Sequence, residues 1–264
     1  MYPISENNLS TRTMITNINV EFDNIYIFQN LPINFKLNEY PCKIVAMYHK
    51  NEPRGDSSFF KKNLASFRNV INIIIQDEKK NTFNIKLTKW GKFQISGCKY
   101  LEETYECIKY LIELIIQKCP LGMQKKAKEI EISFTIVMTN YIYNTGFKID
   151  KEKLNNLMVR DLSHRFYCLF ETAFGYTGLN LKRQIDPSKY DLKIPSFTLR
   201  DGIWIYKEKP YTAIGKNKKF NSFLVFHSGK VICSGMTEKS MNDDYLFFSK
   251  FINDHKKEIV ECIN

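Results

Sequence analysis

The sequence lacks the features of a membrane, secreted or zinc-ribbon protein. No apolar run in its 264 residues is long enough to cross a bilayer, and residues 1–6 are not the basic stretch followed by an apolar one that a secretory signal has. The seven cysteines are scattered, without a Cys-x-x-Cys, which argues against a zinc ribbon and a disulfide framework. We expect an intracellular protein in a reducing compartment, with no membrane partner.

Catalytic and metal-binding patterns are also missing. The four histidines have no metal-ligand spacing with one another. Asp161, Ser163 and His164 are the residue types of a catalytic triad, but neighbouring positions on a helix point in different directions. Asp243 and Asp244 stand at the expected start of a helix, where their charges would match the helix dipole. The sequence therefore predicts no enzyme, no metal and no cofactor.

Acidic residues are fewer than basic ones, 28 against 39, which gives a net charge of +11 and a pI near 9.2. Such a charge fits a polyanionic partner such as nucleic acid. Lysine supplies most of the positive charge, however, and the chain is also rich in Asn and Ile. All three have A/T-rich codons, so an A/T-rich genome would produce the same bias. Charge alone leaves DNA binding open.

What the sequence does contain is a seven-residue phrase that occurs twice, as Gly-Lys-x-x-x-Ser-Gly at 91–97 and at 229–235. Each copy follows a short alternating run and precedes an amphipathic segment. Gly91 and Gly229 lack the rest of a phosphate-cradling loop, and each is expected to supply the positive φ of a hairpin turn. A recurring unit of strand, turn, strand and helix predicts a duplicated fold, which suits a roughly two-fold symmetric partner such as duplex DNA.

Periodicity and turn residues predict the order of the elements. The first half should hold strands at 14–20, 42–48, 70–76, 82–88 and 93–96, helices at 23–31 and 101–116, and a loop at 51–58. The second half should hold a strand at 130–143, a helix from Asp150 to about Leu162, a strand at 178–182, an irregular insertion at 184–220, a hairpin at 223–234 and a helix over 241–259. We expect a polar tail at 1–12, a first repeat at 13–119 and a second repeat at 120–264. The fold class is α+β, an antiparallel sheet with helices on one face and the other face free.

The second hairpin is largely apolar on both faces. Leu224, Phe226 and Ile232 lie on one face, and the residues that alternate with them and would face a helix are also apolar: Phe223, Val225, Val231 and Cys233. One interpretation is a sheet buried on both sides. The other is that Phe226 and Leu224 form an apolar wedge of the kind that minor-groove proteins insert between base steps.

Residues 223–235 resemble the signature hairpin of the TATA-box-binding protein family, in which a Phe, a Ser-Gly-Lys turn and a Thr-Gly recur in each of two repeats. Residues 176–182 resemble the strand before it, and residues 139–142 resemble the strand whose Asn reads the groove centre. The longer loops and residues 93–99 are most similar to the divergent TATA-box-binding-like proteins of large nucleocytoplasmic DNA viruses. The resemblance covers roughly residues 10–262. It implies a saddle of two pseudo-symmetric repeats with helices on the convex face.

The resemblance also implies roles for individual residues. In the second repeat it implies a minor-groove hydrogen bond from Asn140, an inserted pair Tyr176 and Phe226, a groove-lining set Leu224, Ile232 and Ser234, and phosphate contacts from Lys182 and Lys230. In the first repeat it implies an inserted Phe67, with Tyr40 as the alternative, and groove or phosphate positions at Lys92, Gln94, Ser96 and Lys99.

The first repeat departs from the family pattern. Thr88 stands where the second inserted Phe belongs, and Lys86 and Gln94 replace apolar groove-lining residues. Thr13 falls where an Asn is expected, with Asn17 close by. The first half should therefore wedge DNA poorly.

The resemblance implies a transcription initiation factor that would bind and bend A/T-rich promoter DNA through the minor groove. Its other partners would be initiation factors and RNA polymerase. A viral protein of this kind would act in a virus factory in the host cytoplasm or in the nucleus, or be packaged in the virion. The alternatives are a protein-interaction module with weak or no DNA binding, which the polar first repeat favours, and a nuclease, against which stands the lack of an acidic or histidine cluster near the free face.

Overall fold

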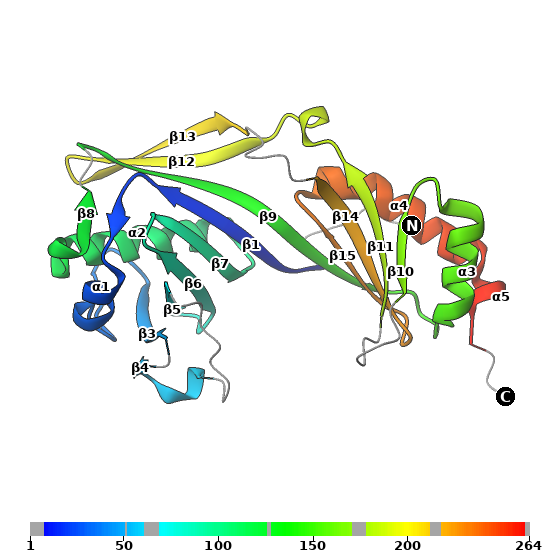
Figure 1. Cartoon of the computed structure of the whole chain (residues 1–264), viewed down its shortest axis with the longest axis horizontal. Helices are drawn as coiled ribbons and strands as arrows, with labels where there is room; N and C mark the ends of the chain where they lie inside the picture. The colour runs from blue at the N-terminus through cyan, green and yellow to red at the C-terminus, as the bar shows by residue number, and fades with distance from the viewer. Residues whose placement is uncertain are drawn as a thin grey trace. The chain divides into compact units, whose positions relative to one another are not determined.

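The computed structural model describes residues 8–50, 52–60, 69–125, 128–170, 178–211 and 218–261, and the chain divides into two compact units. The N-terminal unit comprises Arg12–Thr135 and Lys193–Pro210. The C-terminal unit comprises Met1–Thr11, Ile136–Leu192 and Tyr211–Asn264. Each combines antiparallel strands with helices, so the α+β expectation is confirmed (Figure 1).

The strands of the N-terminal unit run in the order β4, β3, β5, β6, β7 and β1. The bounds of these and the neighbouring elements are β1 (Leu9–Ile18), β2 (Glu21–Phe22), α1 (Asn24–Asn30), β3 (Cys42–His49), β4 (Glu52–Gly55), β5 (Val70–Asp77), β6 (Thr82–Thr88), β7 (Lys92–Cys98), α2 (Leu101–Lys118) and β8 (Met123–Lys125). Asp23 begins α1, because its carboxylate accepts hydrogen bonds from the amides of Ile25 and Tyr26.

The strands of the C-terminal unit run in the order β10, β11, β14, β15 and β9. The elements are β9 (Ile130–Asn144), whose first residues belong to the N-terminal unit, α3 (Lys151–Leu162), β10 (Tyr167–Phe170), β11 (Gly178–Ile185), β14 (Lys219–Phe226), β15 (Lys230–Gly235), α4 (Glu238–Asp254) and α5 (Lys256–Ile259). The strand order thus matches that of the N-terminal unit from β3 to β1.

Both repeated glycines lie in hairpin turns with positive φ, 68° at Gly91 and 82° at Gly229. A Cβ at Gly91 would collide with the carbonyl oxygens of Val20 and Ile18, and one at Gly229 with the carbonyl of Phe147. Both the conformation and the space therefore require glycine, as the sequence predicts.

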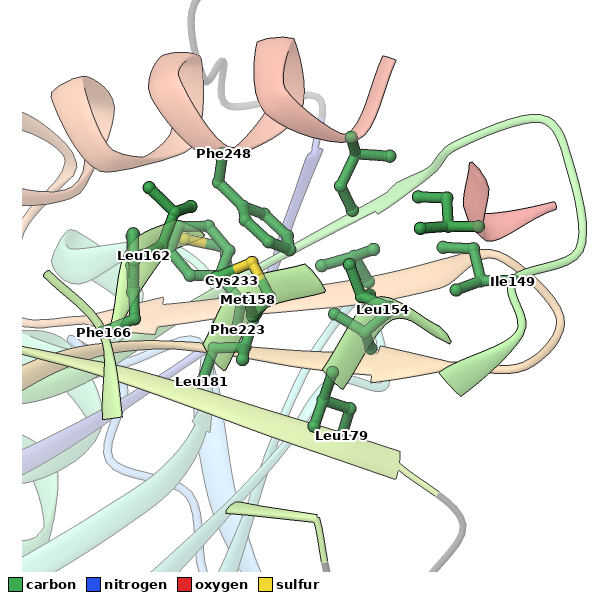
Figure 2. Close-up of a cluster of buried hydrophobic side chains, with 14 of the residues drawn as sticks. Ile149, Leu154, Met158, Leu162, Phe166, Leu179, Leu181, Phe223, Cys233 and Phe248 are labelled. Atoms are coloured by element: carbon green, nitrogen blue, oxygen red, sulfur yellow. The ribbon is translucent and has the colours of Figure 1, made fainter. Parts of the chain in front are cut away.

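One face of the C-terminal sheet is buried beneath the helices (Figure 2). Phe223, Val225, Val231 and Cys233 alternate along β14 and β15 and have no exposed surface. Their partners include Phe248 of α4, whose ring centroid lies 4.5 Å from that of Phe223. Burying one face under α3, α4 and α5 leaves the alternate residues on the opposite face.

Three local expectations are wrong. The insertion at 184–220 is not irregular, since it contains a hairpin of β12 (Lys193–Arg200) and β13 (Ile203–Pro210), which packs in the N-terminal unit. The supposed loop at 51–58 contains β4, an edge strand where Pro53 is tolerated. The last helix ends at Asp254, and Ile259 lies on α5.

Candidate nucleic-acid interface

The strand residues of the C-terminal unit that point away from its helices form one surface, the C-terminal open face. It comprises Met138, Asn140, Ile142, Asn144, Tyr167, Leu169, Asn180, Lys182, Gln184, Phe220, Ser222, Leu224, Phe226, Lys230, Ile232 and Ser234.

Strand register brings five of the predicted residues together on this face. On β15, Ser234 lies opposite Asn140 of β9. Ile232, also on β15, lies opposite Leu224 of β14, the strand on the other side of β15. Lys182 lies opposite Ser222, which in turn pairs with Ser234. Directly opposed residues in antiparallel strands have Cβ atoms about 5 Å apart, so these side chains form two adjacent rows. One row holds hydroxyl, amide and ammonium groups, and the other is mainly apolar.

Phe226 and Lys230 lie at the hairpin end of the open face. Phe226 is half-buried and opposes Gly178, whose missing side chain leaves room for Leu224, since a Cβ there would lie 2.6 Å from Leu224 Cδ1. Lys230 is exposed opposite Asn144. Tyr176, the other member of the inserted pair, lies outside the described residues.

Four large side chains on this face are not among the site residues predicted from the sequence. Tyr167 on β10 is 61% exposed, and Leu169, Phe220 and Met138 are exposed as well. Tyr167 lies opposite Lys182, and Leu169 lies opposite Asn180. The short, continuous apolar run Tyr-Cys-Leu-Phe at 167–170 was the available signal for a strand.

The five strand segments of this unit carry no acidic residue. Residues 136–144, 167–170, 178–185, 219–226 and 230–235 contain no Asp or Glu, whereas Lys182 and Lys230 are basic and on the open face. The side-chain oxygen Oδ1 of Asn140 is buried and has no hydrogen-bond partner within the described residues. The face therefore offers hydrogen-bonding and apolar groups with a positive charge bias, which suits a polyanion.

Asp244 lies on the helix-covered side of the sheet, and the expectation that its charge matches the helix dipole is wrong. It is fully buried, and its carboxylate accepts from Arg183 Nε at 2.6 Å and from Asn221 Nδ2 at 2.8 Å. Arg165 lies 3.4 Å from its other oxygen. Its role is an internal ion pair in the second turn of α4 and not a match to the helix dipole.

The N-terminal unit has a corresponding surface, the N-terminal open face, on β1, β5, β6 and β7. Ser96 lies opposite Thr13, and Gln94 lies between Ile15 and Lys86. Lys92 pairs with Asn17. Lys92 and Gln94 are exposed, as is Lys99 just beyond the strand, whose Nζ lies 5.8 Å from the centroid of the Tyr100 ring.

The outer part of this face is covered by its own chain. Phe59 and Phe60, in the segment after β4, pack on a cluster of Val45, Ala46 and Ile74. Tyr40, the alternative to Phe67, is buried and donates a hydrogen bond to Glu113, so it is unavailable for insertion. Phe67 lies outside the described residues.

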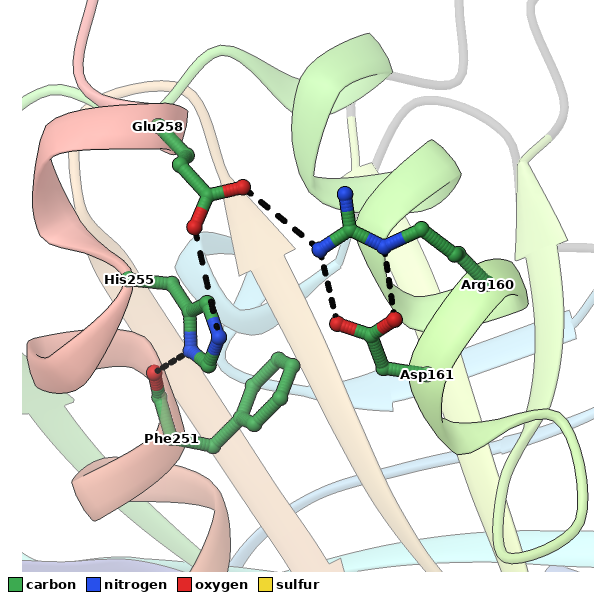
Figure 3. Close-up of polar contacts among 5 residues, drawn as sticks. All are labelled: Arg160, Asp161, Phe251, His255 and Glu258. Atoms are coloured by element: carbon green, nitrogen blue, oxygen red, sulfur yellow. Dashed lines mark hydrogen bonds and ion pairs between the residues drawn. The ribbon is translucent and has the colours of Figure 1, made fainter.

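Other chemistry finds little support in the part of the chain that the structure describes. There, no group of acidic, histidine and cysteine side chains could hold a metal ion, and no helix is long and apolar enough to cross a membrane. Asp161, one of the triad residue types, pairs with Arg160 at 2.6 Å, and Arg160 also reaches Glu258 of α5 (Figure 3). This arginine lowers the pKa of the Asp161 carboxyl.

No family model matches the chain. It is 26% identical over 255 residues to an uncharacterised protein of Invertebrate iridescent virus 6. The match covers 84% of this chain and 76% of the viral protein. A solved structure, Methanococcus jannaschii TBP, aligns with a TM-score of 0.49 and 13% identity, over 94% of this chain and 97% of the other.

The chain is also 21% identical over 258 residues to a TATA-box-binding protein-like protein of Acanthamoeba polyphaga mimivirus. The match covers 86% of this chain and about 60% of the mimivirus protein. Both relatives are viral. The resemblance predicted from the hairpin motifs is thereby confirmed, and this chain is similar to the divergent TATA-box-binding-like proteins of large DNA viruses.

Proposed function

We propose that this protein is a DNA-binding transcription initiation factor that binds and bends A/T-rich promoter DNA through the minor groove. The observation that carries the proposal is the C-terminal open face, which points away from α3, α4 and α5 and lies on strand segments that contain no Asp or Glu. Duplex DNA is a polyanion, so an acid-free face with lysines among apolar and amide groups is a suitable surface for it.

The chemistry of this face fits the minor groove of A·T pairs. That groove presents the acceptors N3 of adenine and O2 of thymine, to which the amide of Asn140 and the hydroxyl of Ser234 donate hydrogen bonds. Leu224 and Ile232 contact the sugars and the groove floor, and Lys182 and Lys230 neutralise phosphates.

Bending follows from Phe226, with Tyr176 as its partner in insertion. Unstacking a base step costs about a few kcal/mol, which added apolar contact and phosphate neutralisation offset. In the N-terminal unit Thr88, Lys86 and Gln94 cannot unstack a step. The bend is therefore centred on the C-terminal unit.

We further infer that the two units arose by internal duplication. In the N-terminal unit Lys86 pairs with Gln94, and at the equivalent positions of the C-terminal unit Leu224 pairs with Ile232. In the same way, Thr13 pairs with Ser96 in the first unit, and Asn140 pairs with Ser234 in the second. Shared register in strands of shared order is the pattern that duplication leaves. The bound factor would present further surfaces to other initiation factors and to RNA polymerase.

A second candidate is a protein-interaction module. The exposed Tyr167, Leu169, Phe220 and Met138 favour it, because clustered apolar side chains mark protein interfaces as readily as DNA contacts.

The deciding experiment is fluorescence polarisation with A/T-rich and G/C-rich duplexes at near-physiological salt. Minor-groove binding predicts a preference for the A/T-rich duplex and a steep fall in affinity with salt. Salt-independent binding, or none, would favour the protein-interaction module.

A further inference from the structure

The N-terminal unit contains a half-open cavity of about 660 Å³ that the groove-binding residues do not explain. Its apolar lining comes from Phe22, Ile25, Val70 and Trp90. This volume lies within the range of about 300–1,000 Å³ that ligand sites occupy.

An aromatic side chain and two cations stand at the cavity. The indole of Trp90 is 71% exposed, and Lys89 Nζ lies 5.3 Å from its ring centroid. Lys50 lines the same cavity. An exposed indole beside ammonium groups is suited to stacking on a planar ring that carries a phosphate nearby.

Asn24 supplies an unused hydrogen-bond acceptor. This side chain is only 8% exposed and lines the cavity. Its Nδ2 donates to the carbonyls of Asn69 at 3.0 Å and Leu87 at 3.4 Å, which fixes the orientation of the amide. Its Oδ1 has no partner among the described residues. A buried acceptor without a donor is unfavourable, so a ligand N–H at this point would be stabilising.

The cavity is continuous with the N-terminal open face. Val70 and Thr88 pair across β5 and β6 on that face, and both also line the cavity. The acidic side chain there, Asp23, is engaged by the amides of Ile25 and Tyr26. Its negative charge is outweighed by the two lysines that line the cavity, Lys50 and Lys89, so a nucleic acid on the open face meets a net positive lining.

We propose that this cavity takes up a single nucleobase that has left the stack of the bound DNA. The base stacks on Trp90, an amino or imino group of the base donates to Asn24 Oδ1, and Lys50 and Lys89 contact the flanking phosphates. This inference rests on the proposed function. An extruded base gains stacking and a hydrogen bond in place of those it loses in the duplex.

The test compares an A/T-rich duplex carrying one unpaired adenosine with the fully paired duplex, using the full chain. Because an unpaired base needs no energy for unpairing, we expect the bulged duplex to bind about tenfold more tightly. Trp90→Ala should remove this preference and Trp90→Phe should keep most of it. Tyr100→Ala is the matched control, since Tyr100 is also exposed, in the same unit, but does not line the cavity.

A second readout places 2-aminopurine at the unpaired position, where stacking on the indole should quench its fluorescence. The nucleobase inference would be overturned if the wild-type protein bound both duplexes equally well, or if Trp90→Ala kept the preference for the bulged duplex. In either case, binding of the paired duplex would leave the proposed function standing. Loss of all duplex binding in the wild-type protein would instead refute the proposed function. Trp90-dependent binding of an acidic peptide without any bulge preference would identify a protein-docking site and overturn the nucleobase inference.

Discussion

Asn140 on β9 lies directly opposite Ser234 on β15, on the face of the C-terminal sheet that points away from the core beneath α3, α4 and α5. The two residues are 94 positions apart in sequence, and the strand register alone joins them. Their pairing creates the polar row that should read the groove.

Asn140→Ala should weaken binding to an A/T-rich duplex by roughly five- to tenfold, the loss of about one hydrogen bond of 1–1.5 kcal/mol. Stability should not fall, because Oδ1 of Asn140 has no hydrogen-bond partner among the described residues. Polarisation titrations and melting curves check both statements. Asn156→Ala, which removes an exposed asparagine side chain from α3, away from the open face, is the control. A destabilised Asn140→Ala protein with normal affinity would contradict this role.

Phe226→Ala should reduce both the affinity for DNA and the bend angle, measured by energy transfer between dyes at the duplex ends. Because Phe226 is half-buried, its removal should cost less stability than that of Phe223, a buried core ring for which about 3–5 kcal/mol is expected. Thr88→Ala should leave bending unchanged. Equal loss of bending in the Phe226 and Thr88 variants would disprove the one-sided wedge.

Lys182→Ala and Lys230→Ala should each flatten the plot of log affinity against log salt by about 0.9, the effect of one lost phosphate contact. Arg160→Ala removes the same charge from the surface of α3, where the arginine pairs with Asp161 and Glu258 (Figure 3). It should leave the slope unchanged. If all three variants flatten the plot alike, the effect comes from net charge and not from contacts on the open face.

Asp244→Asn should destabilise the protein by about 3 kcal/mol, the lower end of the range for breaking a buried ion pair, because Arg165 and Arg183 keep side-chain exposures of 30% and 29%. Asp243→Asn changes the same charge at an exposed neighbour and should have little effect. Chemical denaturation of both variants measures the difference. Equal stabilities would show that the ion pairs contribute nothing net.

Local sequence determined the elements and the faces of the hairpins. The alternation in β14 and β15 assigned Leu224 and Phe226 to one side and Phe223 and Val225 to the other, because strand geometry has a period of two. Gly91 and Gly229 identified their turns because L-residues rarely adopt positive φ. The pair Asp201-Gly202 is the same kind of turn signal for the β12–β13 hairpin, and both residues have positive φ, although no hairpin was predicted there.

Tertiary structure alone decided what depends on distant segments meeting. Nothing local pairs Asp244 with Arg165 and Arg183, because the three residues come from α4, the turn after α3, and β11. The cavity beside Trp90 likewise needs α1, the end of β3 and the β6–β7 turn to converge, and its orphan acceptor appears only when Asn24 is buried among them. Periodicity encodes which face of an element is apolar, whereas packing between elements decides which polar groups end up partnered, and no short window of sequence contains that information.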